Sequence, residues 1–222
     1  GTGASGTGDG PLASGTFHSP LGVTTSGSGL VFVAEQANLI RVIDTLESTS
    51  SYGYLTTLFG DWNTGNGHIN AAGYDARLSG PTAIVRDSDG NLFIADQNNH
   101  TIRKVSFTGG TISPATAVVS DYSYFWYKDQ YDSNYGNNDG AVASATFTNP
   151  RSITIDSANN LYVYGSPFTG YTGVRKISSA GVVSSIRDVA SSGGLVASGN
   201  SGFGIAVDAT TSTLYVAQSG SI

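Results

Sequence analysis

Short apolar runs rich in Val, Ile, Leu, Thr and Tyr alternate along the chain with turns rich in Gly, Ser, Asn and Asp. Two such turns are Ser26–Gly29 and Asp87–Asn91, and their glycines permit the positive φ of a tight hairpin. The pattern predicts successive antiparallel strands. The expected strands are Leu21–Thr25, Leu30–Ala34, Leu39–Asp44 and Tyr54–Phe59; Ala83–Arg86, Leu92–Ala95, Thr101–Ser106 and Thr116–Ser120; Ser152–Asp156, Leu161–Tyr164, Gly173–Ser178 and Val182–Ile186; and Ile205–Asp208 and Leu214–Gln218.

One stretch recurs along the chain and is most complete at Asp139–Val163. Its anchors, Pro20, Pro81, Pro150 and Gly202, are 61, 69 and 52 positions apart. Blade-type repeats have roughly 40–50 residues, so the longer intervals contain insertions, which map to loops on one face. We call the four strands of each unit a to d. The repeat predicts three complete units and strands a and b of a fourth.

Composition agrees with an all-β fold and narrows the functions to consider. Charged residues make up only 12% of the 222 positions, and 30 residues are glycine. A net charge of −6 without a basic run argues against nucleic acid as a partner. Cysteine is absent, which excludes disulfides and cysteine metal sites. No apolar stretch is long enough for a membrane span, and the start at Gly1 predicts a processed or partial chain.

Asn91–Val105, preceded by Pro81 and Asp87, resembles an NHL repeat, which forms one blade of a β-propeller. Two stretches resemble it more loosely: Val31–Ile43, and Asp156–Val163 with Val174–Ile177. The resemblance covers the chain outside the insertions. It implies little about activity, because such propellers serve as binding scaffolds, lyases and hydrolase-like enzymes alike.

The resemblance implies an all-β propeller of four-stranded blades, three complete and one partial, in a single segment over residues 1–222. The blades are expected at about residues 8–60, 61–120, 139–188 and 197–222, with an insertion at 121–138. Tyr164-Gly165 stand where the second unit has Ala95-Asp96, so the third blade is expected to be modified.

Three arginines, Arg41, Arg103 and Arg175, occupy matching places on strand c of their units. A ring of functional charges is one interpretation. We favour a structural role, in which each guanidinium pairs within its blade with a carboxylate such as Glu35 or Asp96.

Two other motifs have simple structural interpretations. Asp87–Asn91 resembles the start of a calcium loop but lacks the closing glutamate, so we predict a hairpin turn. Gly1–Gly6 matches a dinucleotide fingerprint without the strand and helix that such a site needs. We expect Gly1–Gly10 to be a flexible loop between repeats.

The histidines, His18, His68 and His100, have no metal-ligand spacing, and no catalytic motif occurs. His18 precedes a first strand near the expected central channel, and His68 lies in the first insertion. His100 lies in a b–c turn and is expected to be structural. We therefore predict no catalytic residue, no metal and no cofactor.

An aromatic segment fills the second insertion, and the first insertion contains a tryptophan. Such side chains dominate interface energetics, because they bury a large area at little entropy cost. Protein contact, glycan contact and capping of the protein's own blade all fit the segment. The predicted binding residues are Trp62, Tyr122, Tyr124, Phe125, Trp126, Tyr127, Tyr131 and Tyr135. Asn99 begins an N-glycosylation triplet with Thr101, and we predict a glycan there if the chain is secreted.

In an up-and-down blade the d–a and b–c connections share one face. Trp62, Trp126 and Asn99 are therefore expected on the same side of the blades. The sequence predicts a non-enzymatic, extracellular binding or assembly module, a structural or surface glycoprotein able to form filaments. The alternative is a propeller enzyme, lyase or lactonase-like hydrolase, with a metal in the central channel.

We also expect that the chain does not close a propeller alone, because closed propellers have roughly 4–8 blades. Uncovered sheet faces need a partner, which could be another protein or further copies of this chain.

Overall fold

The computed structural model describes residues 3–62, 65–125, 136–165, 173–186, 202–208, 211 and 213–218. Within these residues the regular structure is antiparallel β-sheet with three 3₁₀ helices, η1 (Gly73–Asp75), η2 (Gln97–Asn99) and η3 (Thr108–Gly110). The prediction of an all-β fold is confirmed. None of the helices in the described part of the chain is long and apolar enough to cross a membrane.

The strands form four sheets. Blade 1 has the order β1-β5-β4-β3-β2 and contains β1 (Gly10–Pro11), β2 (Pro20–Thr25), β3 (Leu30–Glu35), β4 (Leu39–Asp44) and β5 (Tyr54–Phe59). Blade 2 has the order β6-β7-β8-β9 and contains β6 (Pro81–Arg86), β7 (Leu92–Asp96), β8 (Thr101–Phe107) and β9 (Ala117–Asp121).

Blade 3 has the order β10-β14-β13-β12-β11 and contains β10 (Gly140–Ala141), β11 (Ser152–Ile155), β12 (Leu161–Tyr164), β13 (Val174–Ile177) and β14 (Val182–Ser185). The fourth sheet is the hairpin of β15 (Gly202–Val207) and β16 (Leu214–Gln218). The predicted strands differ from these at their ends, most of all at β15, which begins at Gly202 and not at Ile205.

Two short strands were not predicted. β1 pairs with β5, and β10 pairs with β14, so blades 1 and 3 each have five strands. From Gly3 onward, the interpretation of Gly1–Gly10 as a flexible loop is wrong, because Ser5 forms a bridge with Phe17 and Gly10 belongs to β1. A two-residue strand carries too little alternation to be recognised in a sequence.

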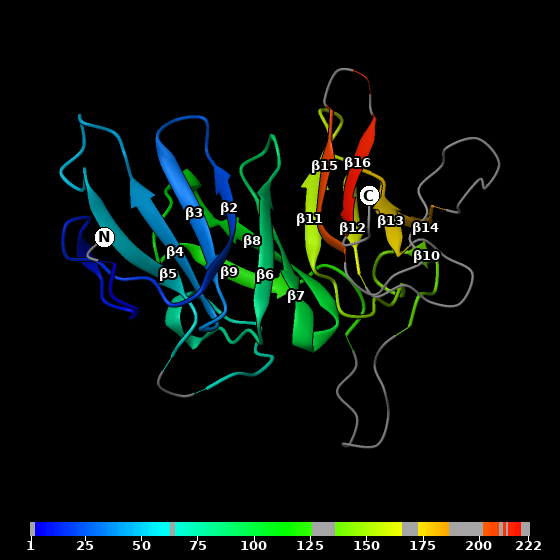
Figure 1. The fold of residues 1–222 in the computed structure, drawn as a ribbon, viewed down its shortest axis with the longest axis horizontal. Coiled ribbons are helices and arrows are strands. Elements are labelled where there is room, and N and C mark those ends of the chain that lie inside the picture. Colours follow the sequence, from blue (N-terminus) through cyan, green and yellow to red (C-terminus); the bar gives the residue numbers. More distant parts are fainter. Residues whose placement is uncertain are drawn as a thin grey trace.

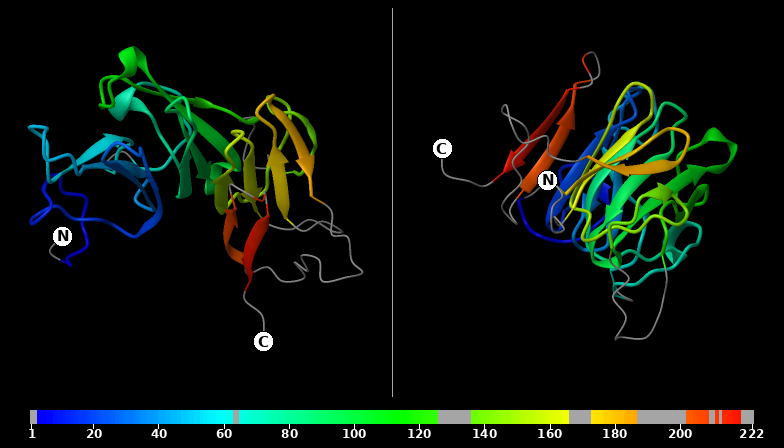
Figure 2. Two further views of the ribbon diagram at one scale, coloured as in Figure 1. Left: turned by 90° about the horizontal axis from the view of Figure 1, so that it is seen from above. Right: turned by 90° about the vertical axis from the view of Figure 1, so that its right-hand side faces the viewer.

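Successive blades meet along their first strands. β2, β6, β11 and β15 lie side by side in this order, and the sheets fan outward from them (Figure 1). Seen from above, the described sheets form an open arc from blade 1 to the β15–β16 hairpin (Figure 2). This is the arrangement of consecutive propeller blades.

Each junction between sheets contains an apolar cluster, because alternate side chains of a strand point to opposite faces. Ile84 and Ile94 of blade 2 pack against Phe32 and Leu58 of blade 1. On the other face of blade 2, Phe93 and Ile102 pack toward Ile153, Val163 and Ile177 of blade 3. Tyr162, Tyr164 and Val174 form the third cluster with Ile205. Blade 2 is thus buried on both faces.

Gly22 allows the closest approach of β2 to β6. A Cβ atom there would lie 2.7 Å from Cα of Ala83 and 3.0 Å from the carbonyl oxygen of Thr82. The repeat aligns Gly22 with Ala83 of blade 2 and with Gly204 of β15. The blade 1 junction therefore requires a glycine at this position.

The b–c turns also connect neighbouring blades. Asn38 has φ 65° and its Oδ1 accepts a hydrogen bond of 2.8 Å from the backbone N–H of Gly80. His100 has φ 55° and its Nδ1 accepts one of 3.0 Å from the backbone N–H of Asn149. In both cases the donor directly precedes the proline, Pro81 or Pro150, with which the repeat position of the next blade begins. The prediction of a structural role for His100 is confirmed.

Candidate functional site

A buried arginine organises the outer part of each blade. Nη1 of Arg41 donates to Oε1 of Glu35 at 2.8 Å, and Nη1 of Arg103 donates to Oδ2 of Asp96 at 3.1 Å. All four of these side chains are fully buried. Charge-assisted hydrogen bonds of this kind are strong, and they also fix the orientation of the guanidinium and the carboxylate. The predicted structural pairing within the blade is confirmed for both arginines, and neither contributes to an exposed ring.

Arg175 keeps only part of this arrangement. Its Nη2 donates to Oδ1 of Asp139 at 2.7 Å. Arg41 makes the same contact with Asp9 at 2.6 Å. Gly165 stands where the other blades have Glu35 or Asp96, so the second carboxylate is absent in blade 3, as the sequence predicted.

In blade 2 the aspartate has moved from the segment before strand a to the last strand, and an asparagine takes its usual place. Asp9 and Asp139 precede strand a in their blades and accept hydrogen bonds from a Thr or Ser of the last strand. In blade 2, Asn70 holds the first place and Asp121, at the end of β9, holds the second. Nδ2 of Asn70 donates to Oδ2 of Asp121 at 2.8 Å, and Oδ1 of Asn70 accepts from Arg103.

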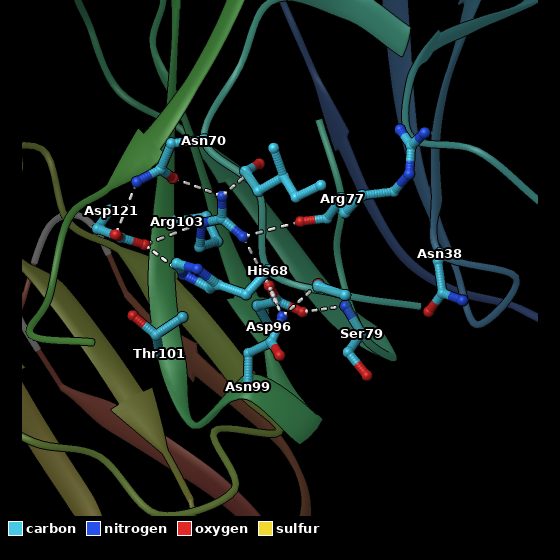
Figure 3. Close-up of polar contacts among 12 residues, drawn as sticks. Asn38, His68, Asn70, Arg77, Ser79, Asp96, Asn99, Thr101, Arg103 and Asp121 are labelled. Atoms are coloured by element: carbon cyan, nitrogen blue, oxygen red, sulfur yellow. Dashed lines mark hydrogen bonds and ion pairs between the residues drawn. The ribbon is translucent and has the colours of Figure 1, made fainter. Parts of the chain in front are cut away.

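His68 adds a further partner to this cluster (Figure 3). Its Nε2 lies 2.7 Å from Oδ1 of Asp121, and Nε of Arg103 lies 3.2 Å from the same oxygen. The His68 ring is stacked on Phe125, with interplanar angle 7°. His68 thereby connects the first insertion to the start of the second.

The Asp121 carboxylate is stabilised in its charged form. Burial opposes ionisation, but the hydrogen bonds from His68 and Asn70 and the nearby positive charges outweigh it and lower the pKa of Asp121. The same balance, with Arg175 and Ser185 as donors, lowers the pKa of Asp139. The carboxylates of Asp121 and Asp139 therefore have a structural role: they hold loops and strands together.

The other acidic motif is a turn. Oδ1 and Oδ2 of Asp87 accept from N and Nδ2 of Asn91, both at 2.8 Å. Asp156 and Asn160 repeat this pair in blade 3, also at 2.8 Å. The hairpin interpretation of Asp87–Asn91 is confirmed. In the part of the chain that the structure describes, no three His, Asp or Glu side chains form a group that could hold a metal ion.

The described residues of the aromatic segment fold back on the blades. Tyr122 lies edge-on to Phe93, with ring centroids 4.7 Å apart, and packs against the cluster between blades 2 and 3. The backbone N–H of Tyr124 donates to Val142 O at 3.2 Å, and Phe125 stacks on His68. These placements agree with the capping alternative. Trp126, Tyr127, Tyr131 and Tyr135 lie outside the described residues.

Trp62 has a different environment. Gly60, with φ 95°, turns the chain after β5, and a Cβ there would lie 2.2 Å from the Asn38 carbonyl oxygen. The Trp62 side chain remains 48% exposed, with its ring centroid 4.7 Å from that of His18. Tyr74, from the same insertion, is 52% exposed. Of the predicted binding residues within the described chain, Trp62 is therefore the one most open to solvent.

Asn99 is held by both hydrogens of its side-chain amide. Nδ2 donates to Oδ2 of Asp96 at 2.7 Å and to the carbonyl oxygen of Gly67 at 2.9 Å. Thr101 of the same triplet is buried. A glycan on Nδ2 would leave one N–H, so one of these hydrogen bonds would be lost. Glycosylation stays a prediction. The Gly67 contact does place the b–c turn of blade 2 beside the first insertion.

Residues 78–105 match the family model described as NHL repeat. The chain contains an NHL repeat within a β-propeller fold. Solved structures extend the likeness in fold beyond this repeat. A structure described as a putative gluconolactonase has a TM-score of 0.55 at 11% identity, and the match covers 97% of this chain and 60% of that chain. No protein among those with curated descriptions matches this NHL-repeat chain.

Two further structures have names of different functional classes. An auxiliary nutrient binding protein from Bacteroides ovatus has a TM-score of 0.51 at 20% identity, covering 78% of this chain and 39% of that one. A virginiamycin B lyase from Staphylococcus aureus has a TM-score of 0.46 at 16% identity, covering 90% and 63%. The NHL-repeat chain thus spans less than two thirds of each of these three proteins. At such identities the likeness shows the fold alone.

Sequence reasoning missed three features of this region of the NHL-repeat chain. Tyr74 was not recognised as a neighbour of Trp62, and the role of Asp9 was not assigned. The exchange of Asn70 and Asp121 was also missed. The recurrence of Asp9, Asn70 and Asp139 at one repeat position was a signal for part of this. No recurrence in the sequence indicated the position of Tyr74.

Proposed function

We propose that this propeller segment is a non-enzymatic binding and assembly module, which uses aromatic side chains on the face of its d–a and b–c connections to contact a protein or a glycan. One contrast carries the proposal. The charged groups near that face are held in structural contacts around Arg41 and Arg103, whereas Trp62 and Tyr74 are about half exposed. Exposed aromatic residues on a rigid support are typical of binding surfaces.

Assembly is supported by the two ends of the arc. On β2, Leu21 is 54% and Val23 is 65% exposed, and on β16 Tyr215 is 59% exposed. In blade 2, by contrast, both sheet faces are covered by neighbours. Exposed apolar sheet faces favour contact with another sheet. Copies of the chain joined end to end would make a heterologous contact, which generates a ring or a filament.

The assembly proposal is tested by the mass of the protein in solution as a function of concentration, measured by light scattering. We expect the native chain to self-associate and Val23→Asp to weaken association. Ser48→Asp, on an exposed turn, is the matched control and should behave like the native chain. A native chain that stays monomeric at every concentration and binds no added protein or glycan contradicts the proposal.

We further propose that the protein acts outside the cell or at its surface, as a glycoprotein modified at Asn99. The triplet at Asn99 supports this. Because Asn99 donates to buried Asp96, modification is expected before the blade closes. Mass spectrometry of the Asn99 peptide from native material decides it, and an unmodified peptide removes the glycan from the proposal.

The alternative is a propeller enzyme of the lyase or lactonase-like kind with a channel metal. The described residues offer no group of three ligands for that metal. A rise in melting temperature on adding divalent cations, together with lactone hydrolysis, would favour the alternative over the binding module.

A further inference from the structure

We propose that the cavity beside Trp62 binds one ring of a neutral saccharide. This inference rests on the proposed binding role of the same face and specifies the ligand there. The cavity has a volume of about 230 Å³, and its lining includes Thr7, Asp9, Thr57, Asp61, Trp62 and Tyr74. Sites for drug-sized molecules measure roughly 300–1,000 Å³, so this cavity suits a single ring.

Four separate segments of the chain build the cavity, one of them β4 through Leu39. Thr7 and Asp9 come from the N-terminal segment, Thr57 from β5, and Trp62 and Tyr74 from the first insertion. The hydroxyl of Tyr74 donates to the carbonyl oxygen of Thr57 at 3.2 Å, which fixes the tyrosine against the blade. Burial and the charge of Asp9 raise the pKa of Tyr74, so the phenol stays protonated and keeps this hydrogen bond.

The aromatic walls provide a surface for the apolar side of a pyranose ring. Trp62 is 48% and Tyr74 52% exposed, and the ring contact with His18 supports the indole. The C–H groups on one side of a sugar ring can pack on an aromatic face, with weak C–H contacts adding to the burial of apolar surface. Stacking of this kind needs little reorganisation when the aromatic residue is held in advance.

The polar walls provide carboxylate acceptors that are already paired with arginines. Oδ1 of Asp9 accepts from Arg41 at 2.6 Å and from the Thr57 hydroxyl at 2.9 Å, whereas Oδ2 accepts from the Thr57 N–H at 2.9 Å. Oδ2 therefore retains acceptor capacity, and the Asp9 side chain is 42% exposed. Sugar hydroxyls are donors that match it.

Charge selects among ligands of similar size. Arg41 lies 2.6 Å from Asp9, and Arg77 lies 3.4 Å from Asp61, so each carboxylate of the cavity already contacts an arginine. A ligand with a carboxylate or phosphate would meet two aspartates, and a cationic ligand would compete with arginines already in place. The cavity therefore favours an uncharged, hydroxyl-rich ring.

The chain has two tryptophans, so Trp126→Phe leaves Trp62 as the single fluorescent reporter. We would titrate this variant with short oligosaccharides of glucose, mannose and galactose, with an oligogalacturonate, and with a lysine tetrapeptide. At least one neutral oligosaccharide should change the Trp62 emission. The oligogalacturonate and the peptide should bind more weakly than that oligosaccharide.

Calorimetry on the otherwise native chain then assigns the site. We expect Trp62→Ala to weaken binding about tenfold or more, and Asp61→Asn about threefold. Tyr52→Ala removes a tyrosine that is 49% exposed elsewhere on the surface and should bind as the native chain does. Trp62→Phe retains an aromatic face and should bind with intermediate affinity. All variants must unfold at the native temperature.

The inference is overturned if no neutral oligosaccharide changes the emission, if the charged ligands bind more tightly, or if Trp62→Ala binds equally well. Should saccharides fail while Trp62→Ala still releases a protein partner, only the saccharide inference falls. If saccharides bind at Trp62 and the protein shows no assembly, the assembly part of the proposed function falls.

Discussion

Nδ1 of His100 accepts a hydrogen bond of 3.0 Å from the backbone N–H of Asn149, and this contact ties blade 2 to blade 3. Asn38 makes the same contact from blade 1 to Gly80 of blade 2, at 2.8 Å. Both acceptors end a b–c turn with positive φ, a conformation in which Asn and His occur more often than most residues. Two different side chains thus serve one position of the repeat, and only one of them titrates near neutral pH.

The first prediction is a pH-dependent stability that depends on His100. Burial lowers the pKa of His100 below its ordinary value of 6.5. The unfolded chain then binds the proton at higher pH than the folded chain. The contribution of His100 is therefore complete above a pH of about 6.5 and is lost as pH falls through the lower folded pKa. Protonated Nδ1 also cannot accept from Asn149.

We expect the free energy of unfolding, measured in urea across this pH range, to fall with acidification. His100→Asn should flatten that part of the curve while retaining the fold, because Asn38 already serves the same position in blade 1. An unchanged slope in the variant contradicts the assignment.

The second prediction concerns the approach of β2 to β6. Gly22→Ala should destabilise the chain by about 1–3 kcal/mol, because the added Cβ meets backbone atoms of Ala83 and Thr82 that cannot move aside cheaply. Gly204→Ala is the control: it has the same repeat position, and a Cβ there has nothing within 4 Å. Thermal unfolding of both variants checks this. Equal losses in both would show that the close approach does not matter.

The third prediction concerns the buried pair of Arg103 and Asp96. Arg103→Gln removes the cation and leaves a buried carboxylate, which should cost about 3–5 kcal/mol. Lys104→Gln changes the next residue of β8, which is only partly buried, and should cost less than about 1 kcal/mol. Denaturant unfolding of the two variants gives the comparison. A small loss for Arg103→Gln would contradict a role of this pair in stability.

The fourth prediction tests the exchange of Asn70 and Asp121. Asp121→Ser removes the acceptor of His68 and Asn70 and should cost about 1–3 kcal/mol. Adding Asn70→Asp gives blade 2 the polar pattern of blade 3, where Asp139 and Ser185 are paired. The double variant should recover part of the lost stability, because neighbouring sites are not additive. Strict additivity of the two changes would refute the equivalence of these positions.

The sequence by itself determined the longer strands and their succession along the chain, but not the short strands β1 and β10. Alternation with period two and the turn glycines mark β2 to β9 almost residue for residue, because these signals are local. The repeat also placed Arg41 and Arg103 at matching positions, from which their pairing with Glu35 and Asp96 followed. In these cases the interacting residues belong to one hairpin, so their separation is fixed by strand geometry.

Only the tertiary structure decided the contacts between distant segments. His68 meets Asp121 across 53 positions, and Thr7, Asp9, Trp62 and Tyr74 surround one cavity although they belong to different segments. No periodicity connects such residues. Their meeting depends on how β1 attaches to β5 and how far each insertion folds back, and both are determined by packing and hydrogen bonds formed after the strands have paired.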